Sequence, residues 1–551
     1  MIVMDKLYLP SREQGPEALN TVEYPPIGLD FGTSNSVLAH YTDEFHRRGA
    51  YAYALPLLDG RNIFPSIICY NKATGKFVTG GAAKVKLVLA PDSVATSIKR
   101  RISSGSVDIA GMKVSPVDLT SRIISGLLRN VRSTELTMEP TVVTMTVPYY
   151  FKQSQNHLLQ QAAIKAFKEV FGKEYNINVI PEPVAAAIDY ICGRSNERNL
   201  SETILVYDIG GGTCDVTVVR YSLSGRSLEF EVLGIDGDEK LGGDDIDYLL
   251  LEYICDENNI DATGLFADKK YAKTISALLD AVRDVKEGLS LQDACNLIIP
   301  SLYVNDSYIN IDTVVTRQEL NDILRNHKRP GQRNSVVAAL DEAIKRLKVK
   351  TRNVAVDVLL PIGGTSMIPA IQKVVKDNYP TSQHLVLPES GTQVSVARGA
   401  AIYSALKDAR GLNPLGKAIR NITVKMRVPH SLSVAMYDGT LVKLINSNSP
   451  APAKATKKFY ATRCDASRQL IELSSIELYQ GDGTHTSSDG VELVGRIDLS
   501  KYRLYTHGRN LKDIPFQVTF QANATNLEAN IMAVGVNEDK TDLMINETIK
   551  L

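Results

Sequence analysis

The sequence has no long apolar run and no excess of either charge. Lysine and arginine together number 62, and so do aspartate and glutamate. This balance gives no overall attraction to nucleic acid or to an anionic membrane. No apolar stretch is long enough to cross a bilayer, and Asp5 and Lys6 interrupt the start before a secretory core could form. We therefore expect a cytoplasmic protein that binds neither nucleic acid nor membranes.

Cysteines are few, and their spacing excludes the common metal and disulfide frameworks. The six cysteines include no C-x-x-C pair and no nearby histidine at metal-ligand spacing. We expect them to be reduced, buried thiols. The chain is 44% hydrophobic and 23% charged, which is typical of a globular protein. Its 551 residues predict three or four structural units of about 150 residues each.

The pattern of apolar and polar residues changes along the chain. Residues 1–23 are polar and predict an N-terminal extension. Residues 24–412 alternate strand-like with helix-like runs, which predicts an α/β domain. Residues 413–425 (NPLGKAIRNITVK) are predicted to be a linker. Residues 426–551 show short runs of period two separated by turn residues, so we predict an all-β domain.

Two glycine-rich tips join strand-like runs in the α/β segment. One lies in PIGLDFGTSNSVLAHY and the other in ILVYDIGGGTCDVTVVR. Because apolar residues alternate on both sides, the tips predict a duplicated β-hairpin rather than a turn into a helix. Glycine amides at such tips can approach a polyphosphate, and Asp30 and Asp208 could hold a hydrated Mg²⁺ beside it. Either tip alone is equally well explained as a tight turn.

A third glycine element has a different order. The stretch DVLLPIGGTSMIPAIQKVV (357–375) is a buried-strand pattern, then Gly363 and Gly364, then a helix pattern. These glycines would allow a flat ligand such as adenosine to lie against the backbone. Close packing of the strand on the helix explains them equally well.

In this order and at these separations, the three elements resemble those of the DnaK-type seventy-kilodalton heat-shock chaperones. PEPVAAAIDY, VTMTVPYYFKQSQ and LGGDDID are also similar to segments of that family, and the resemblance extends from about Ile27 to the C-terminus. It implies an α/β actin-like, two-lobed ATPase domain followed by a peptide-binding β-sandwich. It also implies ATP or ADP and Mg²⁺ as ligands.

The resemblance implies roles for individual residues. Asp30 and Asp208 would hold the water shell of the magnesium ion. The implied catalytic residues are Lys99, Glu182, Asp208, Asp215 and Thr213. The implied nucleotide-binding residues are Gly32, Thr33, Ser34, Asn35, Gly210, Gly211, Gly212, Thr213, Gly242, Gly243, Lys286, Ser290, Gly363, Gly364, Thr365 and Met367. By residue type alone, Lys99 is more often a solvated surface lysine, and Glu182 is equally well a helix N-terminal acid.

In the β-domain, the resemblance implies that backbone hydrogen bonds and an apolar pocket hold an extended hydrophobic peptide. The candidate pocket residues are Val434, Phe459 and Ile476. Alternating apolar residues of a sandwich are more often core than site. The sequence ends at TIKL, where the sandwich would end, so we expect no helical lid and faster peptide release in the ADP state.

The sequence departs from the family pattern at four positions. Met367 and Glu287 stand where basic side chains usually clasp adenine, so purine selectivity can differ. Asn178 replaces the arginine on which a J-domain cochaperone docks, which leaves J-protein partnership open. Asn156 replaces a further arginine, which affects the relay of the nucleotide signal to the linker.

Three functional hypotheses remain. The first is a monomeric, slowly turning over ATPase and chaperone with peptide clients and a nucleotide-exchange factor as partners. The second is a nucleotide-regulated binding module for one dedicated partner, with little ATP turnover. Sugar kinases and filament formers share the actin-like fold, but the C-terminal β-domain argues against both.

Overall fold

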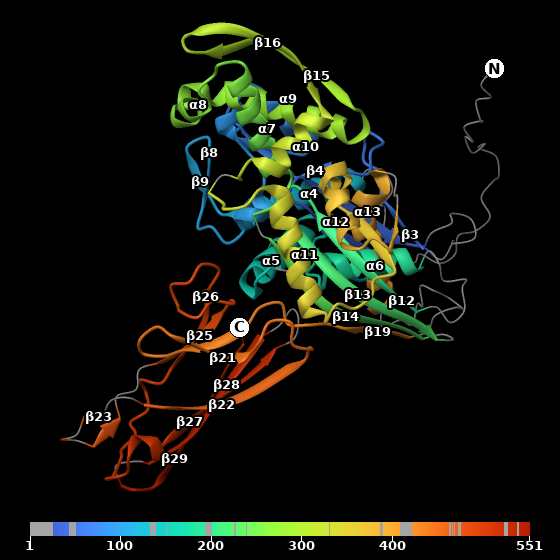
Figure 1. Ribbon diagram of the computed structural model, residues 1–551. Coiled ribbons are helices and arrows are strands. Elements are labelled where there is room, and N and C mark those ends of the chain that lie inside the picture. The colour runs from blue at the N-terminus through green and yellow to red at the C-terminus, as the bar shows by residue number, and fades with distance from the viewer. Residues whose placement is uncertain are drawn as a thin grey trace.

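The computed structural model (Figure 1) describes residues 26–42, 51–132, 139–149, 151–192, 201–224, 227–238, 240–329, 331–385, 389–407, 421–461, 464–465, 467, 469–471, 475–522, 527–536 and 539–550. The predicted extension (1–23) lies outside these residues. Within the described residues, no helix is long and apolar enough to span a membrane. All six cysteines are free, and four of them are buried.

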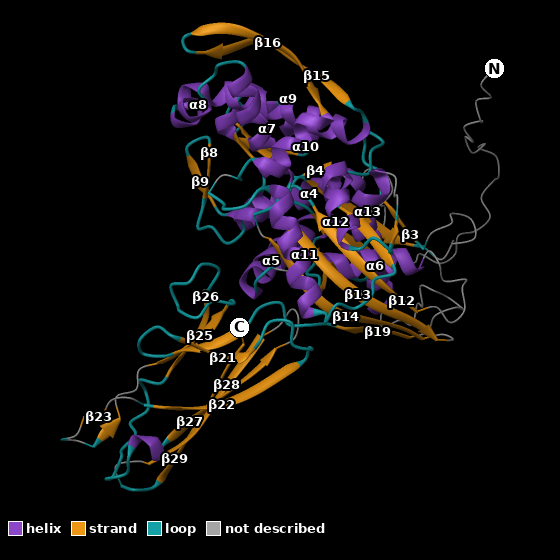
Figure 2. Cartoon of the chain, viewed as in Figure 1, coloured by secondary structure: helices purple, strands orange, loops and turns teal. Residues whose placement is uncertain are grey.

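Two sheets, in which five strands are arranged in corresponding order, form the two lobes of the N-terminal domain (Figure 2). The lobe I sheet consists of β11 (Ile177–Pro181), β10 (Val143–Val147), β1 (Ile27–Phe31), β2 (Asn35–Tyr41) and β3 (Ala52–Ala54), and β4 (Phe64–Pro65) pairs with β2. The lobe II sheet consists of β18 (Gln383–His384), β17 (Val358–Ile362), β12 (Ser201–Ile209), β13 (Cys214–Ser224), β14 (Ser227–Asp238) and β19 (Asn421–Lys425). In each lobe an antiparallel three-strand unit is extended by two parallel strands. The predicted duplication is therefore confirmed.

Helices and small sheets surround these two sheets. On lobe I lie α2 (Gly81–Lys84), α3 (Lys86–Leu89), α4 (Pro116–Arg132), α5 (Gln153–Phe171), β5 (Ile68–Asn71), β6 (Lys76–Thr79), β7 (Val94–Ala95), β8 (Val107–Ile109) and β9 (Met112–Val114). On lobe II lie α7 (Gly243–Glu257), α8 (Ala262–Ala267), α9 (Ala272–Leu291), α10 (Arg317–Asn326), α11 (Val336–Lys350), α12 (Pro369–Asn378) and the long hairpin of β15 (Ala294–Val304) and β16 (Ser307–Thr316). Short 3₁₀ turns are η1 (Pro91–Ser93), η2 (Ile98–Arg101), η3 (Lys269–Tyr271) and η4 (Gly364–Met367).

Two helices pack against each other in the centre of the domain, α6 (Glu182–Cys192) and α13 (Glu389–Lys407). A Cβ atom at Gly399 would lie 1.7 Å from the carbonyl oxygen of Ala185, and one at Gly28 would lie 2.3 Å from that of Ala397. Only glycine permits these approaches of α13 to α6 and to β1. The close packing fixes the ends of β1 and α6, from which Asp30 and Glu182 project.

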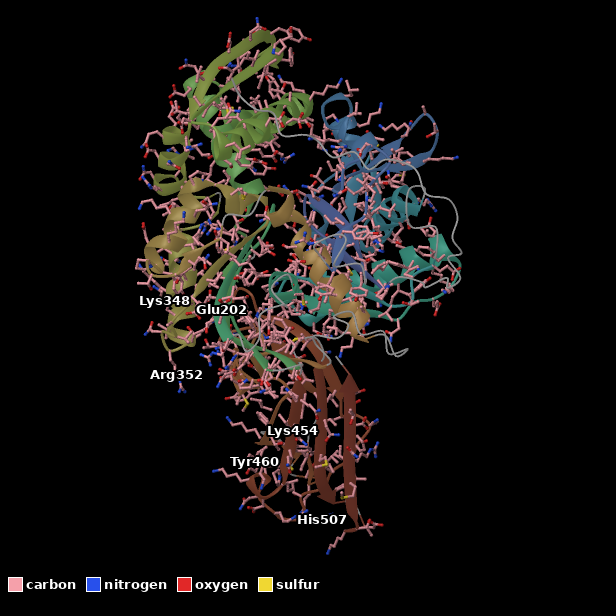
Figure 3. The ribbon with its side chains drawn as sticks, turned by 90° about the vertical axis from the view of Figure 1, so that its right-hand side faces the viewer. Glu202, Lys348, Arg352, Lys454, Tyr460 and His507 are labelled. Atoms are coloured by element: carbon pink, nitrogen blue, oxygen red, sulfur yellow. The ribbon has the colours of Figure 1, made fainter. Side chains whose placement is uncertain are left out.

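The C-terminal β-domain is a sandwich of two four-stranded antiparallel sheets. One sheet has the order β21 (Leu441–Ile445), β20 (Leu432–Ala435), β25 (Ser475–Gln480), β26 (Glu492–Asp498), and the other β22 (Ala453–Tyr460), β27 (Pro515–Ala522), β28 (Leu527–Val536), β29 (Asp542–Lys550). A minor hairpin of β23 (Cys464–Asp465) and β24 (Leu470–Ile471) and the turn η5 (Leu511–Asp513) complete the elements. Inward-facing residues such as Leu478, Phe516 and Phe520 are at most 1% exposed. Figure 3 shows the sandwich below the two lobes, with Lys454, Tyr460 and His507 on its surface.

The predicted linker joins the two domains through a strand. Residues 413–420 lie outside the described residues, and 421–425 form β19, which pairs in parallel with β14. Directly after β19, Arg427 contacts Tyr149 and donates from its Nε to the carbonyl oxygen of Val232 (2.7 Å). The start of α5 contacts the sandwich. Ser154 Oγ donates to Glu492 Oε1 at 2.6 Å, and Lys152 Nζ forms an ion pair with Glu492 Oε2 at 3.3 Å. The sandwich is thus docked against lobe I while the linker strand extends the sheet of lobe II.

Candidate functional site

A cavity of about 420 Å³ lies between the two lobes. Most of the residues proposed for nucleotide binding and catalysis line it: Asp30, Gly32, Thr33, Ser34, Asn35, Lys99, Glu182, Asp208, Gly210, Gly211, Thr213, Gly243, Lys286, Ser290, Gly363, Gly364, Thr365 and Met367. Gly212, Asp215 and Gly242 lie directly behind this lining. Gly212 faces Thr33 and Arg100, and Gly242 packs on Gly211. Asp215 is the cross-strand neighbour of Asp208 in the pairing of β12 with β13. The structure thus brings three distant sequence motifs to one cleft.

The two predicted glycine tips are the turns of true hairpins. The first lies between β1 and β2, and the second between β12 and β13. The second tip is held in place by the N-terminus of α7, since the amides of Gly243 and Asp244 donate to the carbonyl oxygens of Gly210 and Gly211 at 2.9 and 2.7 Å. A hydrogen bond of 2.8 Å from Thr365 Oγ1 to Gly210 O ties the tip to η4. The second tip is therefore rigidly positioned at the cavity.

The third element has the predicted strand, glycine and helix order, with the turn η4 between β17 and α12. Gly363 has a φ of +76°, and a Cβ there would lie 2.5 Å from the carbonyl oxygen of Ile209. Both conditions require glycine. Gly363 therefore permits the close approach of β17 to β12, and Gly364 and Met367 line the cavity beside it.

Lys99 forms a buried ion pair with Glu182. Lys99 belongs to η2 and is 4% exposed, and its Nζ lies 2.5 Å from Glu182 Oε1. The interpretation of Lys99 as a solvated surface lysine is therefore wrong. Glu182 is the first residue of α6, so it is also a helix N-terminal acid. The two interpretations of Glu182 are thus compatible.

Several acids meet around this ion pair, and their pKa values reflect the crowding. Desolvation and the nearby charge of Asp30, offset in part by Lys99, raise the pKa of Glu182 to about 7. Desolvation also raises the pKa of Asp30, although Lys99 and a 2.9 Å hydrogen bond from Thr146 Oγ1 oppose the shift. Desolvation, with the charges of Glu182, Asp215 and Asp30, raises the pKa of Asp208 well above its usual value. One lysine does not neutralise this acid cluster.

The residues present fit a hydrated divalent cation and a polyphosphate. Carboxylate oxygens are the donors that Mg²⁺ prefers, and Mg²⁺ keeps several of its waters. Among the described residues, no group of three or more His, Cys, Asp or Glu side chains is placed to hold a metal. Gly210 faces open space, because a Cβ there would have no atom within 4 Å. Such a bare backbone at a hairpin tip suits the approach of phosphate oxygens.

Sequence reasoning selected Lys286 but missed its charged neighbours Asp247 and Arg283 beside the cavity. Lys286 Nζ lies 2.6 Å from Asp247 Oδ1 and donates to the carbonyl oxygen of Gly243 at 3.0 Å. Arg283, one helical turn earlier on α9, bonds to Asp247 at 3.0 Å. Both cations lie on the buried face of an amphipathic helix, which is the signal that could have placed them together. Glu287 and Met367 also line the cavity.

The candidate peptide-binding residues lie in or against the core of the sandwich. Val434 is 3% and Ile476 9% exposed, and both belong to the core between the two sheets of the sandwich. Phe459 lies on β22 of the facing sheet and packs against the same core. Alternation along a strand selects one face but does not distinguish core from pocket. Val434 and Ile476 thus lie in the core and Phe459 packs against it, and a role for these residues in peptide binding stays a prediction.

Comparison with known proteins agrees with this geometry. Residues 103–549 match the family model described as "Hsp70 protein". The chain is 28% identical over 532 residues to "Chaperone protein DnaK" of Mycoplasma mycoides subsp. mycoides, covering 94% of this chain and 79% of that protein. It is 26% identical over 461 residues to "Chaperone protein DnaK" of Thermotoga petrophila, covering 83% and 70%. With its paired glycine hairpins and its β-sandwich, the chain belongs to the Hsp70 family.

Proposed function

We propose that this protein is an ATP-dependent molecular chaperone whose β-domain binds extended hydrophobic peptide segments under the control of Mg-ATP binding and hydrolysis. One observation carries the proposal: the domain that holds the cavity is joined to the sandwich by a paired strand and by side-chain contacts. A change at the cavity therefore has a direct mechanical route to the β-domain.

The cavity residues can perform phosphoryl transfer to water by positioning and charge neutralisation. The two hairpin tips would hold the phosphates through backbone amides, and Lys99 would approach the terminal phosphate. Glu182, with its pKa near 7, can accept a proton from an attacking water near neutral pH. When bound, Mg²⁺ supplies charge neutralisation of the phosphate oxygens. Asp30 and Asp208 would hold its water shell, and Asp215 and Thr213 would orient the groups around it.

Nucleotide binding and peptide affinity would be coupled through the docked arrangement. In one state β19 extends the lobe II sheet and the sandwich lies against α5. We propose that ATP favours this docked state and that docking lowers the affinity for peptide. Hydrolysis would then release the sandwich from the N-terminal domain and raise its affinity for peptide. We propose slow turnover, and extended hydrophobic clients with a nucleotide-exchange factor as partners. A J-domain partner, a monomeric state and a cytoplasmic location stay predictions.

The dissociation rate of a fluorescent hydrophobic peptide tests the proposal. The rate is measured with ATP, with ADP, and for Lys99→Ala with ATP. We expect faster release with ATP than with ADP, and release from Lys99→Ala should stay fast because the variant keeps its ATP. Lys454→Ala, at an exposed lysine of the sandwich (Figure 3), is the matched control and should behave as the parent protein.

Two outcomes would lead to other conclusions. Equal rates with ATP and ADP would contradict nucleotide coupling. If the protein binds one dedicated partner and shows no measurable ATP turnover, this would instead support a nucleotide-regulated binding module. The departures from the family pattern at Met367, Asn156 and Asn178 favour that second candidate.

A further inference from the structure

We propose that a second, lysine-lined pocket between the lobes binds a small anion with several phosphate groups and thereby holds the lobes together. The pocket has a volume of about 510 Å³, within the range of small-molecule sites. It is separate from the nucleotide cavity, and the two share no lining residue.

The pocket lies where the two lobes meet at the outer end of the cleft. Lobe I contributes the end of β5, α3 and η1, and lobe II contributes η3 and the start of α9. The lobes are already in contact beside it, because Ser276 Oγ on α9 donates to the carbonyl oxygen of Leu87 on α3 at 2.5 Å. A ligand in this pocket would therefore touch both lobes at once.

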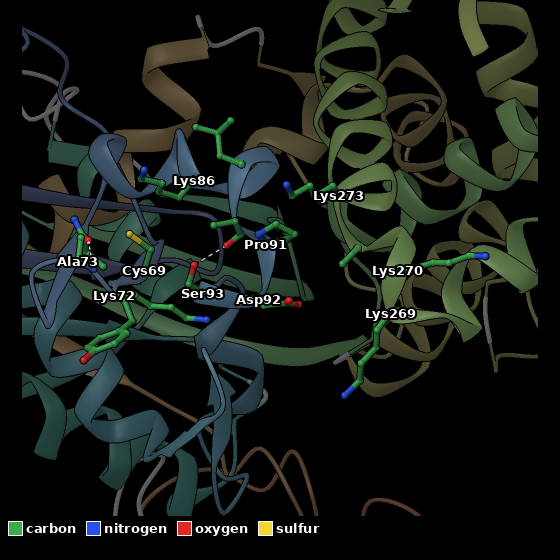
Figure 4. A pocket seen from close by; sticks show the side chains of 15 residues that line it. Cys69, Lys72, Ala73, Lys86, Pro91, Asp92, Ser93, Lys269, Lys270 and Lys273 are labelled. Carbon is green, nitrogen blue, oxygen red and sulfur yellow. Dashed lines mark hydrogen bonds between the residues drawn. The ribbon is translucent and has the colours of Figure 1, made fainter. Parts of the chain in front are cut away.

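Positive charge from both lobes surrounds the pocket. Lys72 and Lys86 stand on the lobe I side, and Lys269 and Lys273 on the lobe II side (Figure 4). All four are exposed, and within the described part of the chain no ion pair joins any of them to an acid. Asp92 is the one acid among the described residues that line the pocket.

The fifth lysine behaves differently. Lys270 lies 3.3 Å from Asp306, and its Nζ is 4.8 Å from the ring centre of Tyr271. Figure 4 shows its side chain directed away from the other lysines. The four lysines that remain line one pocket, and no ion pair among the described residues neutralises them. This arrangement is unfavourable by itself and becomes favourable when an anion is bound.

The geometry favours a compact phosphate compound over an acidic protein segment. The ammonium of lysine is a point charge that binds phosphate, and one multivalent anion can reach lysines on both sides of a pocket of this size. An acidic segment would instead need a long groove for its backbone. A phosphate-rich ligand that bridges Lys86 and Lys273 would oppose separation of the lobes, and so slow nucleotide release.

Isothermal titration calorimetry with inorganic tripolyphosphate tests the site. The protein is first saturated with ADP, with free Mg²⁺ in excess of all phosphate, so that the nucleotide cavity is filled. We expect binding that weakens as salt is added. Removal of three of the four positive charges in Lys72→Gln/Lys86→Gln/Lys273→Gln should lower the affinity roughly tenfold, because each exposed lysine–phosphate contact contributes little. The control Lys457→Gln/Lys458→Gln, at two exposed lysines of β22, should leave it unchanged.

Each result decides the proposal. Retained ADP binding and an unchanged melting temperature would show that the triple variant is folded, and Lys273→Gln alone provides a milder second variant. Equal tripolyphosphate affinity in the parent and the variants would overturn the site. Binding of an aspartate-rich peptide but not of tripolyphosphate would assign the surface to a protein partner and also overturn it. Release of a fluorescent ADP analogue should slow about threefold with tripolyphosphate in the parent protein only, and an unchanged rate would refute the bridging role.

Discussion

The hydroxyl of Tyr149 makes two hydrogen bonds to the backbone of Arg427, 278 residues further along the chain. It donates to the carbonyl oxygen at 3.0 Å and accepts from the amide at 2.9 Å. Tyr149 follows strand β10 of lobe I and is 3% exposed, while Arg427 begins the sandwich. Burial raises the pKa of Tyr149, so the group remains a neutral donor. This contact holds the β-domain against lobe I of the N-terminal domain.

Tyr149→Phe should therefore loosen the docked state. Two partly buried backbone groups lose their partner, at about 1–3 kcal/mol each where water cannot replace it. We expect the docked fraction with ATP to fall, seen as lower energy transfer between fluorophores placed on the two domains. Tyr303→Phe is the control, because that hydroxyl bonds to Asp306 on the exposed β15–β16 hairpin. Equal energy transfer in both variants would contradict the locking role.

Gly210→Ala should separate ligand binding from folding. A Cβ at Gly210 would meet no protein atom within 4 Å, and its φ is not positive. The free energy of unfolding of the Gly210→Ala variant should therefore differ from that of the parent by no more than about 0.5 kcal/mol. The methyl group would occupy the space proposed for phosphate oxygens, so ATP affinity should fall about tenfold or more.

Gly105→Ala is the matched control, because it also has open space around a new Cβ but lies outside the cavity. Both variants are compared by thermal unfolding and by titration with ATP. Full ATP affinity in Gly210→Ala would mean that the phosphates do not lie against this tip.

The fold was predictable where the signal is local. The two glycine hairpins follow from alternation on both sides of a turn, and Gly363 from a strand that ends before a helix. The ion pair between Lys99 and Glu182 was not predictable from residue type, since 83 positions separate the partners and nothing nearby marks Lys99 as buried. Only the family resemblance selected it.

Period-two alternation also predicted the β-domain, but it could not distinguish the core from a binding pocket. Val434 and Ile476 illustrate this limit, because a buried core face and a peptide-binding face carry the same apolar pattern. The linker shows a related limit. Its last five residues have a strand pattern, but which sheet they join depends on the long-range contact with β14.

Glu182 should make the stability of the nucleotide-free protein depend on pH. Its pKa is raised from 4.5 to about 7 in the folded protein, so the folded state binds a proton more tightly than the unfolded state. Its contribution to stability is therefore full below the unfolded pKa and is lost as pH rises through the folded value. Glu182→Gln removes this pH-dependent contribution to stability.

The difference in free energy of unfolding between the parent and Glu182→Gln is measured by urea denaturation between about pH 5 and about pH 8. We expect the parent to lose stability relative to the variant as pH rises, with most of the loss complete near neutral pH. A difference that is constant with pH would show that the buried ion pair with Lys99 keeps the pKa of Glu182 near its ordinary value, and one that grows in the parent's favour would show a pKa below it.

Docking of the linker strand should depend on one face of β19. Val424 packs against the core cluster beneath the lobe II sheet, whereas its neighbour Thr423 is exposed. Val424→Asp places a charge against apolar side chains, which costs several kcal/mol unless the strand leaves the sheet. Thr423→Asp adds the same charge to the same strand on the solvent side. We therefore expect Val424→Asp to abolish the difference in peptide release between ATP and ADP, and Thr423→Asp to retain it. Loss of the difference in both variants would attribute the effect to charge near the linker rather than to pairing of β19 with β14, and retention in both would show that docking of this strand does not carry the signal.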